Sequence, residues 1–64
     1  MKNIIKERRK EHNLSQKDLS MKVNVSRQTI NAIENNKYDP SLSLAFDLAK
    51  ALETTIEQLF ENEE

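Results

Sequence analysis

Apolar positions along the chain recur at intervals of three and four residues, and no alternating run predicts a strand. This spacing is typical of short helices that each bury one face. It predicts a first helix over about residues 2–12, with Ile5, Arg9 and His12 on one side. The starts of the remaining helices are predicted from serine and threonine, whose side chains bind the unpaired amides of a first turn.

Four further helices are marked by such residues. The candidate N-caps are Ser15, Ser26, Ser41 and Thr54. Two of them are followed three residues later by an acid, Asp18 and Glu57, which makes a capping-box pattern. The expected fold is therefore all-α, with five helices around one core of Ile5, Leu14, Leu19, Val23, Val25, Ile30, Ile33, Ala45, Leu48, Ala49, Leu52, Ile56 and Leu59.

The fourth helix is apolar nearly all round. Its polar residues Ser43, Asp47 and Lys50 form one narrow stripe, so the helix is expected to be covered on two sides. A second copy of the chain could provide one of these covers. The predicted homodimer interface consists of Leu42, Leu44, Phe46, Leu59 and Phe60. The alternative is that Phe46 and Phe60 complete the core of a monomer.

The chain contains no glycine, although five short helices require chain reversals with positive φ. Asparagine tolerates the left-handed region better than other residues with a side chain. Asn13, Asn24 and Asn36 each stand where a helix is expected to end, and positive φ is predicted at all three.

Length and composition exclude several classes of protein. The 64 residues predict a single domain over 1–64, with a frayed acidic tail at 61–64. Without cysteine, and with His12 as the one histidine, neither a metal site nor a cofactor is predicted. The paired carboxylates lie only in the tail, so an enzyme is not predicted. The longest apolar run is three residues, which predicts no membrane span, no signal peptide and a cytoplasmic location.

The charges are unevenly distributed. Residues 1–38 carry nine basic and four acidic side chains, a net +5, whereas residues 39–64 carry one basic and seven acidic, a net −6. Such a chain offers a positive face to a polyanion. Two solvated faces of opposite charge are the alternative interpretation.

The segment QKDLSMKVNVSRQTINAIEN, about residues 16–35, has a helix-turn-helix pattern. Ser20 is small where two helix backbones would approach, and Asn24 suits the turn. With LSQKDL, VSRQTINAIENNKYDPSL and LFE in register, roughly residues 2–60 resemble the lambda-repressor-like family of Cro/cI (xenobiotic-response-element) type. Asn13, Asn24, Asn36 and Glu53 replace glycines of the family, and Ser20 replaces its usual alanine.

The resemblance implies that the second helix of the motif enters the major groove of double-stranded DNA. The base-reading residues it implies are Ser26, Arg27, Gln28 and Asn31. The phosphate contacts it implies are Gln16, Lys17, Thr29, Asn35, Lys37 and Tyr38. Arg9 and Glu34 match positions that pair internally in the family.

The function implied is a sequence-specific transcriptional regulator, a homodimeric repressor on a palindromic operator. The alternative is a protein-interaction module that reuses the fold, such as an antitoxin or a dimerisation domain with a protein partner. Polar residues at Arg27, Gln28 and Asn31 favour DNA binding.

Overall fold

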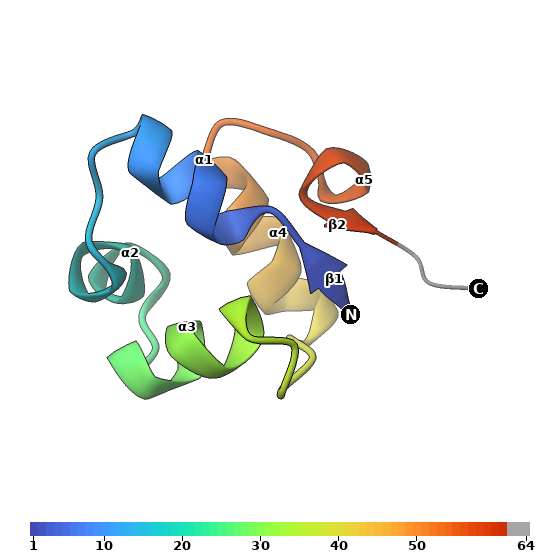
Figure 1. Cartoon of the computed structure of the whole chain (residues 1–64), viewed down its shortest axis with the longest axis horizontal. Coiled ribbons are helices and arrows are strands. Elements are labelled where there is room, and N and C mark those ends of the chain that lie inside the picture. Colours follow the sequence, from blue (N-terminus) through green and yellow to red (C-terminus); the bar gives the residue numbers. More distant parts are fainter. Residues whose placement is uncertain (62–64) are drawn as a thin grey trace.

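The computed structural model describes residues 1–61, which form five helices and one short antiparallel strand pair (Figure 1). The elements are β1 (Lys2–Asn3), α1 (Ile5–Glu11), α2 (Gln16–Val23), α3 (Arg27–Glu34), α4 (Leu42–Ala51), α5 (Ile56–Leu59) and β2 (Phe60–Glu61). The predicted five-helix fold is confirmed. Among the described residues, no helix is long and apolar enough to cross a membrane.

Three of the predicted N-caps start the helices as expected. The Oγ atoms of Ser15, Ser26 and Ser41 accept hydrogen bonds from the amides three residues on, at 2.9, 3.1 and 3.1 Å. The capping box of α2 is complete, because the Ser15 amide donates to Asp18 Oδ2 at 3.0 Å. These bonds satisfy amides that a first helical turn leaves unpaired.

The predicted cap of α5 is wrong by one residue. Thr55 is the N-cap, and its Oγ1 accepts from the Gln58 amide at 3.2 Å. Thr54 instead belongs to the end of α4, because its amide donates to the Ala49 carbonyl at 2.9 Å. Glu53, between α4 and α5, has φ 55°, so the chain leaves α4 through a left-handed residue before α5 begins.

The three asparagines predicted to have positive φ do so. The angles are 57° at Asn13, 60° at Asn24 and 60° at Asn36. At the ends of α1 and α3, the amide of the left-handed asparagine and the amide of the residue after it both donate to carbonyls of the last helical turn, as in a Schellman motif. The short side chain of asparagine therefore replaces glycine at these turns.

The prediction of a helix from residue 2, and of no strands, is wrong at the chain's start. Lys2 pairs with Glu61 and Asn3 with Phe60, and the Ile4 amide donates to the Leu59 carbonyl at 3.0 Å. Backbone groups of residues 2–4 thus bond across to the end of α5 and to β2 rather than along a helix. Of the predicted acidic tail, Glu61 forms part of this pair and residues 62–64 lie outside the described residues.

The core lies where the helices meet around α4, which packs against α2 and α5. The core residues are Ile5, Leu19, Val23, Ile30, Ile33, Ala45, Leu48, Ala49, Leu52, Leu59 and Phe60. Leu14, Val25 and Ile56, predicted as core, are only partly buried against it. Leu59 and Phe60 are 0% and 8% exposed. Leu59 is therefore a core residue, as one of its two predictions had it, and Phe60 completes the core of the monomer, so neither presents the exposed side chain expected of an interface residue. The β1–β2 pair holds the end of α5 against the core and turns both side chains inward.

Candidate nucleic-acid interface

The helix-turn-helix is formed by α2 and α3, which contact each other directly. Ser20 is 4% exposed, and its hydroxyl donates to the Lys17 carbonyl at 2.7 Å. The turn after α2 is closed by two amides, of Asn24 and Val25, that donate to the Ser20 carbonyl. A small residue in the second helical turn of α2 and a left-handed Asn24 thus set the approach of α3.

The exposed side of α3 carries three of the four predicted base-reading residues. Arg27, Gln28 and Asn31 line a shallow recess of about 210 Å³ together with Gln16 from the start of α2. Arg27, Gln28 and Asn31 are exposed, and Gln16 is half-buried. The structure therefore brings donors and acceptors from two helices into one open surface, with guanidinium and carboxamide groups of the kinds that pair with base edges.

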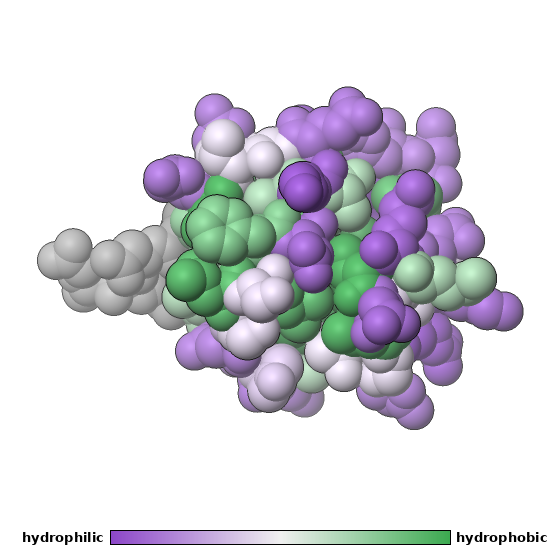
Figure 2. Space-filling view, turned by 180° about the vertical axis from the view of Figure 1, so that it is seen from behind, coloured by the Kyte–Doolittle hydropathy of each residue, from purple (hydrophilic) through white to green (hydrophobic). Residues whose placement is uncertain are grey.

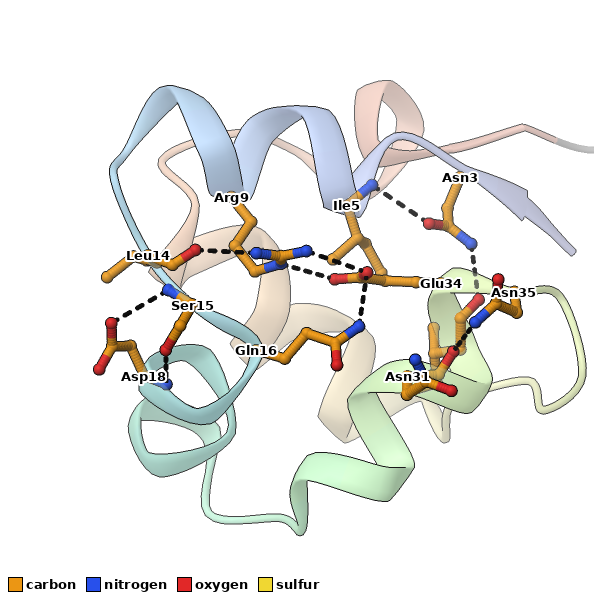
Figure 3. Close-up of polar contacts among 11 residues, drawn as sticks. Asn3, Ile5, Arg9, Leu14, Ser15, Gln16, Asp18, Asn31, Glu34 and Asn35 are labelled. Atoms are coloured by element: carbon orange, nitrogen blue, oxygen red, sulfur yellow. Dashed lines mark hydrogen bonds and ion pairs between the residues drawn. The ribbon is translucent and has the colours of Figure 1, made fainter.

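Beneath this surface lies the ion pair that the resemblance implied (Figure 3). Arg9 Nε donates to Glu34 Oε2 at 2.8 Å and Arg9 Nη2 to Glu34 Oε1 at 3.3 Å. Arg9 Nη1 donates to the Leu14 carbonyl at 2.9 Å, so the guanidinium joins α1, the α1–α2 loop and the end of α3. The Arg9 and Glu34 side chains are 10% and 4% exposed. Removing one partner of a pair buried this deeply lowers the stability of the fold by several kcal/mol.

Gln16 is attached to the same pair. Its Nε2 donates to Glu34 Oε1 at 3.1 Å (Figure 3), a link that the sequence did not predict. An amide nitrogen has two hydrogens, so one is engaged by Glu34 and the other can donate to a ligand. The buried pair therefore orients a side chain of the candidate interface.

The far end of α3 is held by Asn3, which the sequence did not mark as functional. Asn3 Nδ2 donates to the Ile33 carbonyl at 2.9 Å and to Asn36 Oδ1 at 3.3 Å, while its Oδ1 accepts from the Ile5 amide at 3.1 Å. The same residue pairs with Phe60 in the strand pair. One side chain thus connects the start of α1 to the end of α3, and only the folded chain reveals this contact.

Three predicted contact residues are engaged within the chain. The Ser26 hydroxyl caps α3 and lies 3.0 Å from Thr29 Oγ1 in a hydrogen bond. The Thr29 hydroxyl, predicted as a phosphate contact, is therefore hydrogen-bonded to the cap of its own helix in the free protein. Asn35 ends α3, and its Nδ2 donates to the Asn31 carbonyl at 2.8 Å.

The other predicted phosphate contacts lie at the edges of this surface. Lys17 is exposed in the first turn of α2, and Lys37 and Tyr38 are exposed in the loop after α3. The Lys37 amide donates to the Ala32 carbonyl at 2.9 Å and so fixes the start of this loop to α3. The start of α2 and the loop after α3 thus flank the exposed residues of α3.

The predicted interface residues separate into two groups. Leu42 and Phe46 are 69% and 57% exposed on α4, and Leu44 is half-buried against the core. Phe46 borders a recess of about 390 Å³, whose other lining residues are Ala49, Lys50, Thr54, Thr55, Ile56 and Glu57. The predicted interface residues that are exposed to a partner therefore lie on α4, beside the start of α5.

One ionisable group near the interface is perturbed. Hydrogen bonds from the Ser15 backbone amide and then from the Ser15 hydroxyl lower the pKa of Asp18, with smaller contributions from Lys17 and Lys22. Asp18 thus remains ionised in the first turn of α2, where a negative charge is favourable. In residues 1–61 no group of three His, Cys, Asp or Glu could hold a metal ion.

Comparison with known proteins agrees with this geometry. Residues 5–59 match the family described as Helix-turn-helix. An uncharacterised HTH-type transcriptional regulator of Methanocaldococcus jannaschii is 58% identical over 60 residues, which cover 94% of this chain and 91% of that protein. YgzD of Bacillus subtilis, with the same description, is 45% identical over 64 residues, covering 100% and 97%.

A solved structure is also similar. One chain in the complex of the SinR protein with the SinI protein superposes with a TM-score of 0.82 at 27% identity. The alignment covers 91% of this chain but only 57% of that one. Fold, surface and relatives together define a DNA-binding transcriptional regulator. The chain belongs to the helix-turn-helix family of Cro/cI type, as its motif predicted.

Proposed function

We propose that this regulator is a sequence-specific repressor that binds a palindromic operator as a homodimer, with α3 in the major groove. The observation that supports this most directly is the recess shared by Gln16, Arg27, Gln28 and Asn31. Its polar groups are open to a ligand, while the Arg9–Glu34 pair below keeps the underlying backbone in place.

The chemistry of these side chains assigns them different bases. Arg27 suits the two acceptors of guanine, whereas Gln28 and Asn31 suit the donor and acceptor of adenine. Ser26 is not assigned a base, because its hydroxyl already caps α3.

Phosphates are assigned to the edges of the same surface. Gln16 has one remaining N–H at the start of α2, and Lys17, Asn35 and Lys37 stand on either side of α3. Helix starts favour anions, and cations set the salt dependence of binding. The net +5 of residues 1–38 agrees with this placement, and the net −6 of residues 39–64 belongs to the part assigned away from DNA.

Repression would then result from occlusion. Two recognition helices, roughly 34 Å apart, would fill successive major grooves and block the polymerase. A dimer is supported by the exposed Leu42 and Phe46 on α4. Figure 2 shows apolar side chains gathered on the face opposite to that of Figure 1, between hydrophilic ones. A regulator of this kind would act in the cytoplasm, where it meets DNA.

The second candidate function is a protein-interaction module that uses the same apolar surface for another protein. The recess beside Phe46 favours it, as does the similar SinR chain, which was solved in complex with a second protein. A salt titration on random duplex DNA separates the two candidates. A DNA-binding protein shows a steep loss of affinity with salt, whereas a module that binds only protein shows no binding.

The test of the proposed repressor is selection of duplexes from a random pool by the purified protein, followed by footprinting. We expect a palindromic consensus with half-sites about one helical turn apart. Enrichment of no sequence would refute sequence-specific binding, and a consensus without two-fold symmetry would refute the homodimer.

A further inference from the structure

A second recess adjoins the candidate base-reading surface. It is lined by Gln28, Thr29 and Ala32 of α3 and by Tyr38 of the following loop, and its volume is about 240 Å³. Gln28 also lines the recess with Arg27 and Asn31, so the two lie next to each other along α3. Tyr38 is 53% exposed, which leaves its ring accessible from outside.

Local backbone geometry brings Tyr38 to α3. The left-handed Asn36, with φ 60°, reverses the chain at the end of the helix. The Lys37 amide then donates to the Ala32 carbonyl at 2.9 Å, and Asn3 binds Asn36 from the other side. The recess is therefore formed by backbone bonds of the free protein and does not require a ligand.

The lining is uncharged and mostly apolar. The Thr29 hydroxyl is hydrogen-bonded to Ser26 Oγ at 3.0 Å, which leaves the methyl group as its unengaged part. Ala32 adds a second methyl group and Tyr38 an aromatic ring. A phosphate would need a cation or several N–H groups, and these four side chains supply only the Gln28 amide and the Tyr38 hydroxyl. In the major groove, the 5-methyl of thymine is the apolar group that base edges present.

We propose that this recess receives the 5-methyl group of a thymine adjacent to the base read by Gln28. Tyr38 is then a specificity-determining residue, through its ring, and not the phosphate contact that the family resemblance implied. The proposal rests on the proposed function, since it requires α3 to lie in the major groove.

The test uses the duplex selected by the wild-type protein, with each thymine replaced in turn by deoxyuridine, which lacks only the methyl group. We expect one position in each half-site to lose about three- to tenfold in affinity, the effect of burying one methyl. In Tyr38→Ala the thymine and deoxyuridine duplexes bind equally. In Tyr38→Phe the difference remains, because the ring is kept.

The neighbouring Lys37→Ala serves as the matched control, which weakens both duplexes equally and preserves their ratio. Melting temperatures of all variants establish that they fold. If no thymine position is sensitive, or if the sensitivity survives Tyr38→Ala, the recess does not bind the methyl group. A loss of affinity in Tyr38→Phe that is equal on thymine, deoxyuridine and random duplexes would also overturn the proposal, since it would show a phosphate contact. Those results leave the selected consensus intact, whereas failure to select any duplex refutes the proposed function itself.

Discussion

Backbone conformation at single residues explains how a chain without glycine forms four tight turns. Asn13, Asn24, Asn36 and Glu53 have φ between 55° and 60°, where a side chain normally costs energy. Three are asparagine, which reduces this cost. At Glu53 the turn is supported by Arg8, whose Nη2 donates to the Leu52 and Glu53 carbonyls at 2.7 and 3.0 Å. Arg8 thus binds carbonyls that the end of α4 leaves free.

The turn between α2 and α3 provides a prediction at this scale. Asn24→Gly is expected to leave stability unchanged or slightly higher, because glycine adopts φ 60° without a clash. Asn24→Val is expected to lower the free energy of unfolding by about 1–3 kcal/mol, since a β-branched residue is strained there. Urea unfolding of both variants measures the difference. Equal midpoints would contradict the left-handed conformation.

Individual elements differ in how well the sequence predicts them. The starts of α2, α3 and α4 were predicted correctly, because a cap depends on a serine and the amide three residues on. The start of α5 was predicted one residue too early, because Thr54 and Thr55 are both suitable caps. Thr54 is bonded to the end of α4, so Thr55 caps α5. The β1–β2 pair joins residues about sixty positions apart and is two residues long, too short for any periodicity.

The candidate site divides in the same way. Arg27, Gln28 and Asn31 were predictable, because the motif places them on the first turns of one helix. The contacts from Gln16 to Glu34 and from Asn3 to Ile33 were not, since each depends on how separate elements pack. Leu59 was predicted both in the core and in the interface, and Phe60 was left open between them, because a hydrophobic pattern does not distinguish a core from an interface.

The capping box of α2 predicts a pH dependence. The lowered pKa of Asp18 means that its ionised form stabilises the fold above its ordinary pKa of 3.8, and that this contribution is lost as the pH falls through the lower folded value. Asp18→Asn is expected to remove this part of the acid dependence of the unfolding midpoint. Asp47→Asn, in the middle of α4, is the control and should retain it. Identical acid dependence in wild type and Asp18→Asn would contradict the assigned cap.

For the whole molecule, the basic charge and the predicted dimer surface belong to different regions. Residues 1–38 carry the positive charge and the helix-turn-helix, and α4 carries the exposed Leu42 and Phe46. A single small domain reads few base pairs, so a dimer would raise both affinity and selectivity. This arrangement allows self-association through α4 while α3 remains open to DNA.

Self-association is therefore expected to depend on Phe46. In sedimentation at micromolar concentration, we expect the wild type to dimerise and Phe46→Glu to remain monomeric, because a charge would be buried in the interface. Met21→Glu changes a still more exposed apolar residue, on α2, and should still dimerise. A wild type that is monomeric both free and on a palindromic duplex would contradict the dimer.

In the proposed complex, α3 reads bases while the flanking residues hold phosphates. The most direct measurement is the affinity of Gln28→Ala and Lys37→Ala for the selected duplex and for random duplexes over a series of salt concentrations. Gln28→Ala should lower affinity for the selected duplex by about 1–3 kcal/mol and leave random DNA nearly unchanged. Lys37→Ala should weaken both kinds of duplex alike and reduce the salt slope by about one. Equal loss on every sequence in both variants would contradict base reading by α3.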